Sequence, residues 1–188
     1  MSPFHTEDLG PVYGFQWKHF GAKYVHMHTG YSGQGVDQLA QVIQTTGLTQ
    51  MTGESSCLPG TLVTDQRWPC LPAMPLSSST PVYQRSADMG LGVPFNIASY
   101  SLLTYMIALI CNLKPGDFVH TLTDAHVYLN HIQPLTIQLQ RSPRPFPRLE
   151  LRRQVSDIDK FVYDDIILHD YQDTHGHGCL ASFIPFPC

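Results

Sequence analysis

The chain has 188 residues, of which 43% are hydrophobic and 14% are charged, and its formal net charge is −4. This is the composition of an ordinary globular protein, so it excludes a disordered chain and predicts one domain with room for a core. The slight negative charge offers no basic surface for nucleic acid, and we predict no nucleic-acid partner.

Cysteine usage and the first residues indicate a compartment. The five cysteines are spaced irregularly and form no Cys-x-x-Cys pair, which suits a reducing environment better than a disulfide framework. The residues after Met1 lack the basic and apolar parts of a signal peptide. We therefore expect a cytoplasmic protein with no membrane partner.

Residues 1–35 are rich in Gly, Tyr and His, and we predict loops with short strands there. Gln16 and Trp17 continue an alternating segment of this kind. By pattern alone, Tyr13 is a packed aromatic side chain. The segment Val36–Thr45 is predicted to form an amphipathic helix, because its apolar residues recur at helical spacing.

Residues 46–82 have a different character. Gly, Ser, Thr and Pro dominate, and no strand longer than Leu62-Val63 alternates. A compact domain seldom carries so long an irregular segment. We interpret residues 46–82 as a divergent insert within a single domain that covers residues 1–188.

The next stretch, Tyr83–Asn96, combines a strand, a Gly-rich turn and the entry to a helix. Tyr83–Ser86 is predicted as a strand, whereas Gly90, Gly92 and Pro94 are unsuited to the interior of a strand or helix. This arrangement brings four polar side chains to one end of the structure: Arg85, Ser86, Asp88 and Asn96.

These side chains suit a small polar anion that carries a base. Arg85 can grip a phosphate with two parallel hydrogen bonds, and Ser86 adds a hydroxyl group. Asn96 offers a donor and an acceptor side by side, which matches the edge of a nucleobase. The alternative is a tight turn with polar surface groups.

The apolar run Ile97–Leu113 approaches the length of a membrane span, but polar residues such as Ser99, Thr104 and Asn112 interrupt it. We therefore predict a buried helix rather than a membrane span. This helix is predicted to pack on a mixed sheet that includes Tyr83–Ser86 and Phe118–Leu122.

Two strands are predicted after this helix, Phe118–Leu122 and Ile132–Leu139. Between them Asp124, His126 and Tyr128 alternate, which places all three on one face of an extended segment. A surface histidine beside a packed tyrosine is the alternative interpretation.

A His-x-His-x-Cys cluster at residues 175–179 superficially resembles a set of metal ligands. Metal sites built from such residues pair one short cluster with a second, and no second cluster follows here. We predict no metal site.

Three segments are similar to the thymidylate synthase family, in the family's order: Asp8–Trp17, Gln84–Asn96 and Asp124–His131. The resemblance covers the C-terminal two-thirds of the family's pattern, and residues 46–82 and the last residues depart from it. We expect the family's N-terminal segment to be absent. The resemblance implies an α+β fold with a mixed β-sheet packed against helices, and one face of that sheet would form a homodimer interface.

The resemblance also implies a methyltransferase reaction, the methylation of dUMP to dTMP with 5,10-methylenetetrahydrofolate as cosubstrate. A cysteine thiolate would add to carbon 6 of the uracil ring and so activate carbon 5. Tyr13 and Asn96 would act in catalysis. The residues implied to bind substrate are Arg85, Ser86, Asp88, Gly92, Asn96, His126 and Tyr128. All of these except Gly92 are expected to converge on one pocket, with Tyr13 on its rim.

The departures concern the nucleophile and the phosphate. Residues 46–82 lack the family's adjacent arginines and its Pro-Pro-Cys-His motif, and Cys70 precedes Leu71 with no histidine beside it. Leu48–Ser56 can be back-translated with chosen synonymous codons and then read from one base earlier, and it then encodes Thr-Asn-Pro-Asp-Asp-Arg-Arg-Ile-Ile. Trp68–Met74, treated in the same way, encodes Ala-Leu-Pro-Pro-Cys-His.

A frame disturbance across this region is therefore a hypothesis, and we expect no useful turnover from the chain as written. Three interpretations stay open. The first is a thymidylate synthase by descent and fold. The second is a catalytically inactive fragment that binds nucleotide or pairs with an intact subunit. The third is an unrelated nucleotide-binding module.

Overall fold

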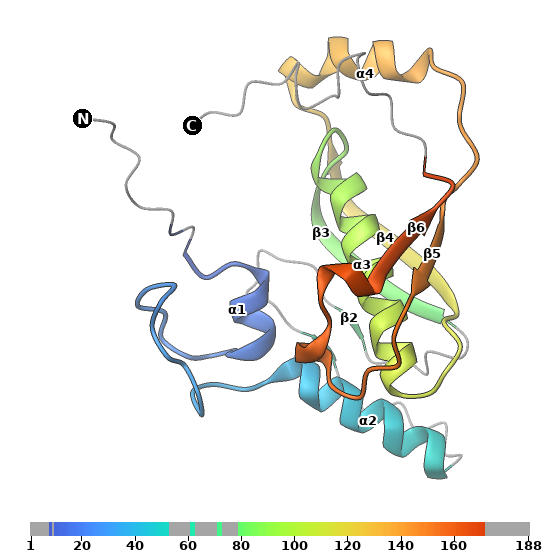
Figure 1. The fold of residues 1–188 in the computed structure, drawn as a ribbon. Helices are drawn as coiled ribbons and strands as arrows, with labels where there is room; N and C mark the ends of the chain where they lie inside the picture. The colour runs from blue at the N-terminus through green and yellow to red at the C-terminus, as the bar shows by residue number, and fades with distance from the viewer. Residues whose placement is uncertain (1–7, 9, 53–60, 63–70, 73–78, 172–188) are drawn as a thin grey trace. The chain divides into compact units, whose positions relative to one another are not determined.

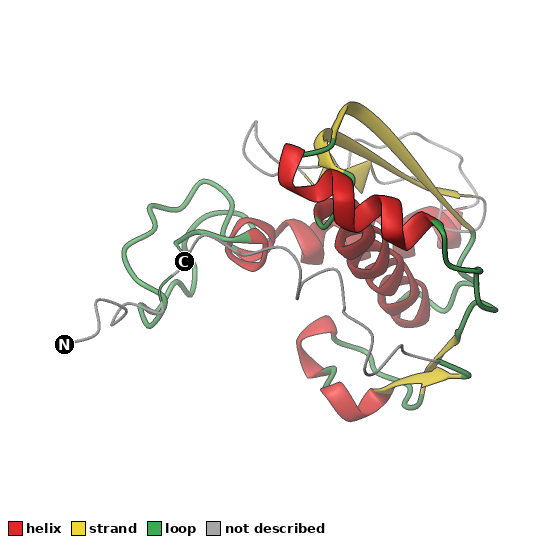
Figure 2. Ribbon diagram, turned by 90° about the horizontal axis from the view of Figure 1, so that it is seen from above, coloured by secondary structure: helices red, strands yellow, loops and turns green. Residues whose placement is uncertain are grey.

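The computed structural model describes residues 8, 10–52, 61–62, 71–72 and 79–171 (Figure 1). The chain forms two compact units, one of Met1–Arg85 with Gly116–Thr121 and one of Ser86–Pro115 with Leu122–Cys188. Helices and strands both contribute to the described residues, as the α+β prediction requires (Figure 2). The prediction of a single domain stays a prediction.

The first unit contains α1 (Tyr13–Lys18), α2 (Gln38–Thr52), β1 (Thr61–Leu62) and β2 (Leu71–Pro72). The second contains α3 (Gly92–Ile110), η1 (Leu129–His131), α4 (Ile132–Leu139), β5 (Arg148–Leu151), η2 (Ile158–Lys160), η3 (Tyr163–Asp165) and β6 (Ile166–His169). Strands β3 (Ser79–Asp88) and β4 (Asp117–His126) have residues in both units.

Helix α1 corrects the prediction of an alternating segment at Gln16 and Trp17. The amide of His19 donates to the carbonyl of Phe15 at 2.7 Å, and the rings of these two residues lie 5.6 Å apart. Side chains four residues apart meet on a helix but not on a strand, so this aromatic pair favours the helix. The side-chain Nε2 of Gln38 in α2 donates to the backbone carbonyl of Gln16 at 2.8 Å.

Helix α2 confirms the predicted amphipathic helix, with different limits. It begins after Asp37, whose carboxylate accepts the Ala40 amide at 2.9 Å and pairs with Lys18 at 2.8 Å. A carboxylate in this position satisfies a free amide and opposes the positive end of the helix dipole. Leu39 and Val42 are buried on one face. The helix continues to Thr52, so the first part of the predicted irregular segment is helical.

The described strands form three two-stranded sheets rather than the single mixed sheet that we predicted. Strands β3 and β4 pair with each other, which confirms that the two predicted strands Tyr83–Ser86 and Phe118–Leu122 share a sheet. Strands β1 and β2 form an antiparallel pair, as do β5 and β6. In β3, Val82 and Gln84 are buried, and the side chain of Gln84 contacts Nε2 of His120 in β4 at 2.9 Å.

Helix α3 is the long apolar helix of the second unit. Tyr100, Leu103 and Ile107 bury one face of it, whereas Phe95 is 68% exposed, so the prediction of a buried helix holds for one face. By length and a mean hydropathy of 1.5, α3 could also cross a membrane. Burial of a stripe at helical spacing is the pattern of a helix packed on one side.

Helix α4 occupies the residues that we predicted as a strand, so that prediction was wrong. Leu135, Ile137 and Leu139 alternate in the sequence, but Ile137 and Leu139 are exposed and no sheet face covers them. Pro134 lies in the first turn of the helix, where its missing N–H would have no intrahelical partner. The turn of 3₁₀ helix at η1 leads directly into α4.

The antiparallel pair β5–β6 is closed by a buried carboxylate. Asp165 accepts two hydrogen bonds from the guanidinium of Arg153, and its second oxygen also accepts the Val162 amide at 3.0 Å. The Arg153 contact lowers the pKa of Asp165 to about 2. The Arg152 amide donates to the Asp165 carbonyl at 2.8 Å, which fixes the same residue through its backbone.

Candidate functional site

Asp88 ends β3 and organises the turn into α3. Its Oδ1 accepts the Gly90 amide at 3.0 Å, and its Oδ2 accepts the amides of Leu91 and Gly92 at 3.2 and 3.3 Å. Burial alone would raise the pKa of Asp88, but these three N–H groups outweigh it and the pKa is lowered. The carboxylate thus occupies the anion-binding end of α3 itself.

The end of β4 lies against this turn. The amide of Met89 donates to the carbonyl of His126 at 3.0 Å, so the residue after Asp88 is tied to a predicted site residue. The rings of His126 and Tyr128 meet edge to face at 5.2 Å. Strand β4 ends at His126, and Tyr128 just beyond it keeps an extended backbone, with φ −67° and ψ 145°, as the predicted extended segment requires.

His131 is a neighbour of this group that sequence reasoning missed. Its ring meets Tyr128 edge to face at 5.3 Å, and its Nδ1 lies 3.4 Å from Oδ1 of Asp88. Burial identifies His131, because it is 4% exposed, and burial cannot be read from the sequence pattern.

Gly92, Asn96 and Ser86 belong to the same unit as Asp88. A Cβ atom on Gly92 would lie 3.4 Å from Cβ of Asp88, which is an ordinary van der Waals contact. Asn96 lies four residues further along α3, on the same face as Gly92. Ser86 is two residues before Asp88 in β3, which gives these two side chains the same direction.

Tyr13 and Arg85 belong to the first unit. Tyr13 begins α1, its ring lies 5.9 Å from that of Trp17, and burial raises its pKa. Arg85 is exposed on β3. A pocket that all the predicted site residues share therefore stays a prediction, while Asp88, His126 and Tyr128 lie together in the second unit.

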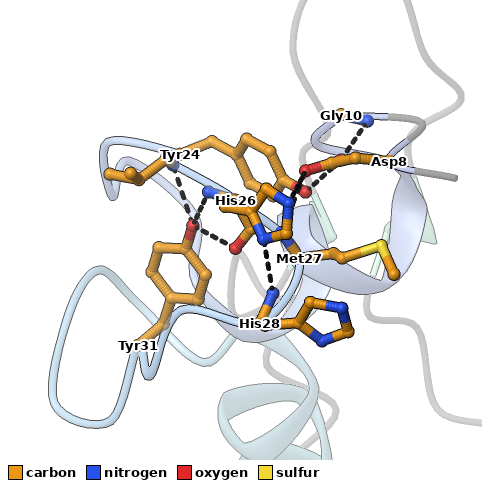
Figure 3. A network of polar contacts seen from close by, with 8 residues as sticks. Asp8, Gly10, Tyr24, His26, Met27, His28 and Tyr31 are labelled. Atoms are coloured by element: carbon orange, nitrogen blue, oxygen red, sulfur yellow. Dashed lines mark hydrogen bonds and ion pairs between the residues drawn. The ribbon is translucent and has the colours of Figure 1, made fainter. Parts of the chain in front are cut away.

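A hydrogen-bond network holds the segment that leads to Tyr13 (Figure 3). The Asp8 carboxylate accepts the Tyr24 hydroxyl at 2.5 Å, the Gly10 amide at 2.8 Å and the Met27 amide at 3.0 Å. The Tyr24 bond is the main cause of the lowered pKa of Asp8, and it raises the pKa of Tyr24 to about 12.

Tyr31 closes the other side of the same loop. Its hydroxyl accepts the amides of Val25 and His26 at 2.8 and 3.0 Å and donates to the carbonyl of His26 at 3.0 Å (Figure 3). The ring of Tyr31 meets that of Phe15 at 4.9 Å, which connects the loop to α1. The two tyrosines and Asp8 thus fix the backbone on both sides of Tyr13.

The described residues contain one cysteine thiol, Cys111, which is buried at the end of α3. Burial raises the pKa of this thiol, and a protonated thiol is a poor nucleophile. Cys70 and the cluster at residues 175–179 lie outside the described residues. Within the part that the structure describes, no group of three or more His, Cys, Asp and Glu side chains could hold a metal ion.

Comparison with known proteins matches residues 3–178 to the family model described as thymidylate synthase. The thymidylate synthase of Equine herpesvirus 2 is 54% identical over 187 residues, which is 92% of this chain and 62% of the relative. The thymidylate synthase of Homo sapiens is 55% identical over 175 residues, which is 87% of this chain and 55% of the relative. For that of Saccharomyces cerevisiae the identity is 48% over 181 residues, 87% of this chain and 60% of the relative. The chain thus spans less than two-thirds of the length of these relatives.

Proposed function

This chain belongs to the thymidylate synthase family, and we propose that it binds dUMP and serves the methylation of dUMP to dTMP with 5,10-methylenetetrahydrofolate as cosubstrate. One observation carries the proposal. The Asp88 turn and the His126–Tyr128 segment, which are distant in sequence, are joined by the hydrogen bond between Met89 and His126. A nucleotide bound as we propose would take hydrogen bonds from both segments at once.

Each candidate residue has a role that follows from its chemistry. Tyr128 is 54% exposed, so its hydroxyl can reach a ligand, and with His126 it would bond the deoxyribose hydroxyl. Asn96 would pair with the uracil edge, and Arg85 with Ser86 would hold the phosphate. Asp88 would order the cosubstrate and its waters from the start of α3, with Gly92 keeping the backbone close. Tyr13 would support proton transfer.

We propose further that the chain acts as a homodimer through the outer face of β3 and β4. Tyr83 on β3 and Val119 on β4 are exposed apolar side chains within the first unit. Contacts between two sheets are usually made by exposed apolar residues on the strands that face each other. Sedimentation of the chain and of Val119→Glu tests the dimer: a dimer that the variant dissociates supports it, and a monomeric wild type contradicts it.

A second candidate function is that of an inactive nucleotide-binding fragment or dimer partner. The sequence context and the burial of the cysteines favour it. The reaction needs a thiolate that adds to carbon 6 of uracil, and the Pro-Pro-Cys-His context of the family does not occur in this sequence. Cys111 cannot replace it, because its thiol is buried and its pKa is raised.

Calorimetric titration with dUMP and an assay of dihydrofolate formation separate these functions. dUMP binding with turnover supports the first, binding without turnover supports the second, and absence of both contradicts both. Tyr128→Phe should weaken dUMP binding by about two- to tenfold, the effect of one hydrogen bond. The same variant should leave the affinity for the 3′-deoxy analogue unchanged, and Tyr163→Phe, whose ring is 88% exposed, is the matched control.

A further inference from the structure

We propose that His131 is a positioning residue, which joins Asp88 to Tyr128 by donating the proton on its Nδ1 to the Asp88 carboxylate. The effect on dUMP rests on the proposed function, whereas the position of the proton does not. Three independent contacts lead to this inference.

The first contact is with the carboxylate. Nδ1 of His131 lies 3.4 Å from Oδ1 of Asp88, and the His131 side chain is 5% exposed. In the described part of the chain this nitrogen has no hydrogen-bond partner. A buried polar atom without a partner is costly, so a small rotation that completes the Nδ1–H···Oδ1 bond is favourable.

The second contact is with the backbone of the turn. A Cβ atom on Gly90 would lie 2.5 Å from Nδ1 of His131, so only glycine at this position lets the imidazole approach the turn. The Gly90 amide itself donates to the same Oδ1 atom of Asp88. The glycine therefore leaves room for two donors on one oxygen.

The third contact is with Tyr128. The amide of His131 donates to the Tyr128 carbonyl at 2.9 Å, and the two rings meet edge to face at 5.3 Å. His131 thus touches the turn that ends in α3 and the residue proposed for the deoxyribose. The positions of the turn and of Tyr128 therefore both depend on where the His131 ring lies.

Asp88→Asn tests the proton directly, in the ligand-free full chain. Two backbone N–H donors, from Leu91 and Gly92, point at Oδ2, whereas one, from Gly90, points at Oδ1. The amide nitrogen of the new side chain therefore loses fewer hydrogen bonds at Oδ1 than at Oδ2. It therefore takes the place of Oδ1 and donates to Nδ1 of His131. The imidazole proton must then move to Nε2.

Long-range proton–nitrogen NMR of the imidazole reads which nitrogen carries the proton. We expect Nδ1–H in the wild type and Nε2–H in Asp88→Asn. A ring that only fills space would not respond to this change. Nε2–H in the wild type, or the same tautomer in both proteins, overturns the inference even if dUMP binds as proposed.

Affinity for dUMP provides the second measurement. His131→Phe keeps a ring against Tyr128 but removes the donor, so the Kd should rise about tenfold, as for loss of a hydrogen bond to a charged group. His131→Asn should recover most of this loss, because its amide nitrogen is as many bonds from Cβ as Nδ1 is. Equal affinity of both variants and the wild type overturns the inference, and a wild type that does not bind dUMP overturns only the proposed function.

Discussion

The hydroxyl of Tyr24 donates to Oδ1 of Asp8 at 2.5 Å and joins two residues that are 16 positions apart. Asp8 lies just before the turn that leads into α1, and Tyr24 begins the loop that Tyr31 closes. This one bond therefore anchors a loop that has little regular structure to the helix that begins at Tyr13.

Tyr24→Phe removes that bond and leaves the rest of the ring in place. We expect a lower Tm, by a few degrees, because the Asp8 carboxylate loses its shortest donor. Thermal unfolding followed by circular dichroism measures the change, and Tyr163→Phe, at an exposed tyrosine, is the control. Equal Tm values for the two variants would contradict the role of the bond.

Asp165 predicts how stability depends on acid. The pKa of Asp165 in the folded protein is about 2, below its ordinary value of 3.8. The ionised carboxylate therefore contributes its full stabilisation of the fold above pH 3.8. The contribution is lost as the pH falls from about 3.8 toward about 2, where the carboxylate binds a proton and releases Arg153. Urea unfolding at several pH values should show this loss.

The matched control for this experiment is the neighbouring carboxylate. Asp165→Asn should be less stable than the wild type at neutral pH and should flatten the dependence below pH 3.8. Asp164→Asn changes the same charge at an exposed position, and it should keep the wild-type slope. A steep acid dependence in Asp165→Asn would assign the effect to another group.

Helix α2 contains a glycine that its structure does not require. Gly47 lies inside the helix, and a Cβ atom there would meet nothing within 4 Å. Gly47→Ala should raise the free energy of unfolding by about 0.5–1 kcal/mol, because the unfolded chain loses freedom. Gly35→Ala should act in the opposite sense, since φ is +69° and the new Cβ would lie 2.6 Å from the His19 carbonyl oxygen. Chemical unfolding of both variants is the measurement.

The helix and strands that could be predicted from the sequence are those whose spacing of apolar residues indicates burial on one side. Tyr83–Ser86 and Phe118–Leu122 lie inside β3 and β4, and Ile97–Leu113 largely coincides with α3. The strand prediction failed at a segment that no described sheet buries, Ile132–Leu139. Ile132, Ile137 and Leu139 are exposed there, and the proline in the first turn and the preceding 3₁₀ turn are compatible with the helix that forms instead.

The candidate site was predictable in its residue types but not in its contacts. Asp88 stood out as a polar residue before a glycine turn, yet its three amide donors depend on the path of that turn. His131 had no signal of its own, because an isolated histidine after a tyrosine and an asparagine is a common surface pattern. Its burial results from folding that brings Gly90 and Tyr128 together.

We predict that the chain as written forms dihydrofolate at a rate far below that of an intact family enzyme. Carbon 5 of uracil becomes reactive only after a thiolate adds to carbon 6, and loss of a nucleophile alone costs on the order of 10⁶-fold in kcat in a well-studied protease. Cys111 is buried with a raised pKa, so Cys111→Ser should leave any residual rate unchanged. The decisive variant is Cys70→Ser in the full chain with dUMP and 5,10-methylenetetrahydrofolate. Turnover equal to that of an intact enzyme and abolished by Cys70→Ser would make Cys70 the nucleophile.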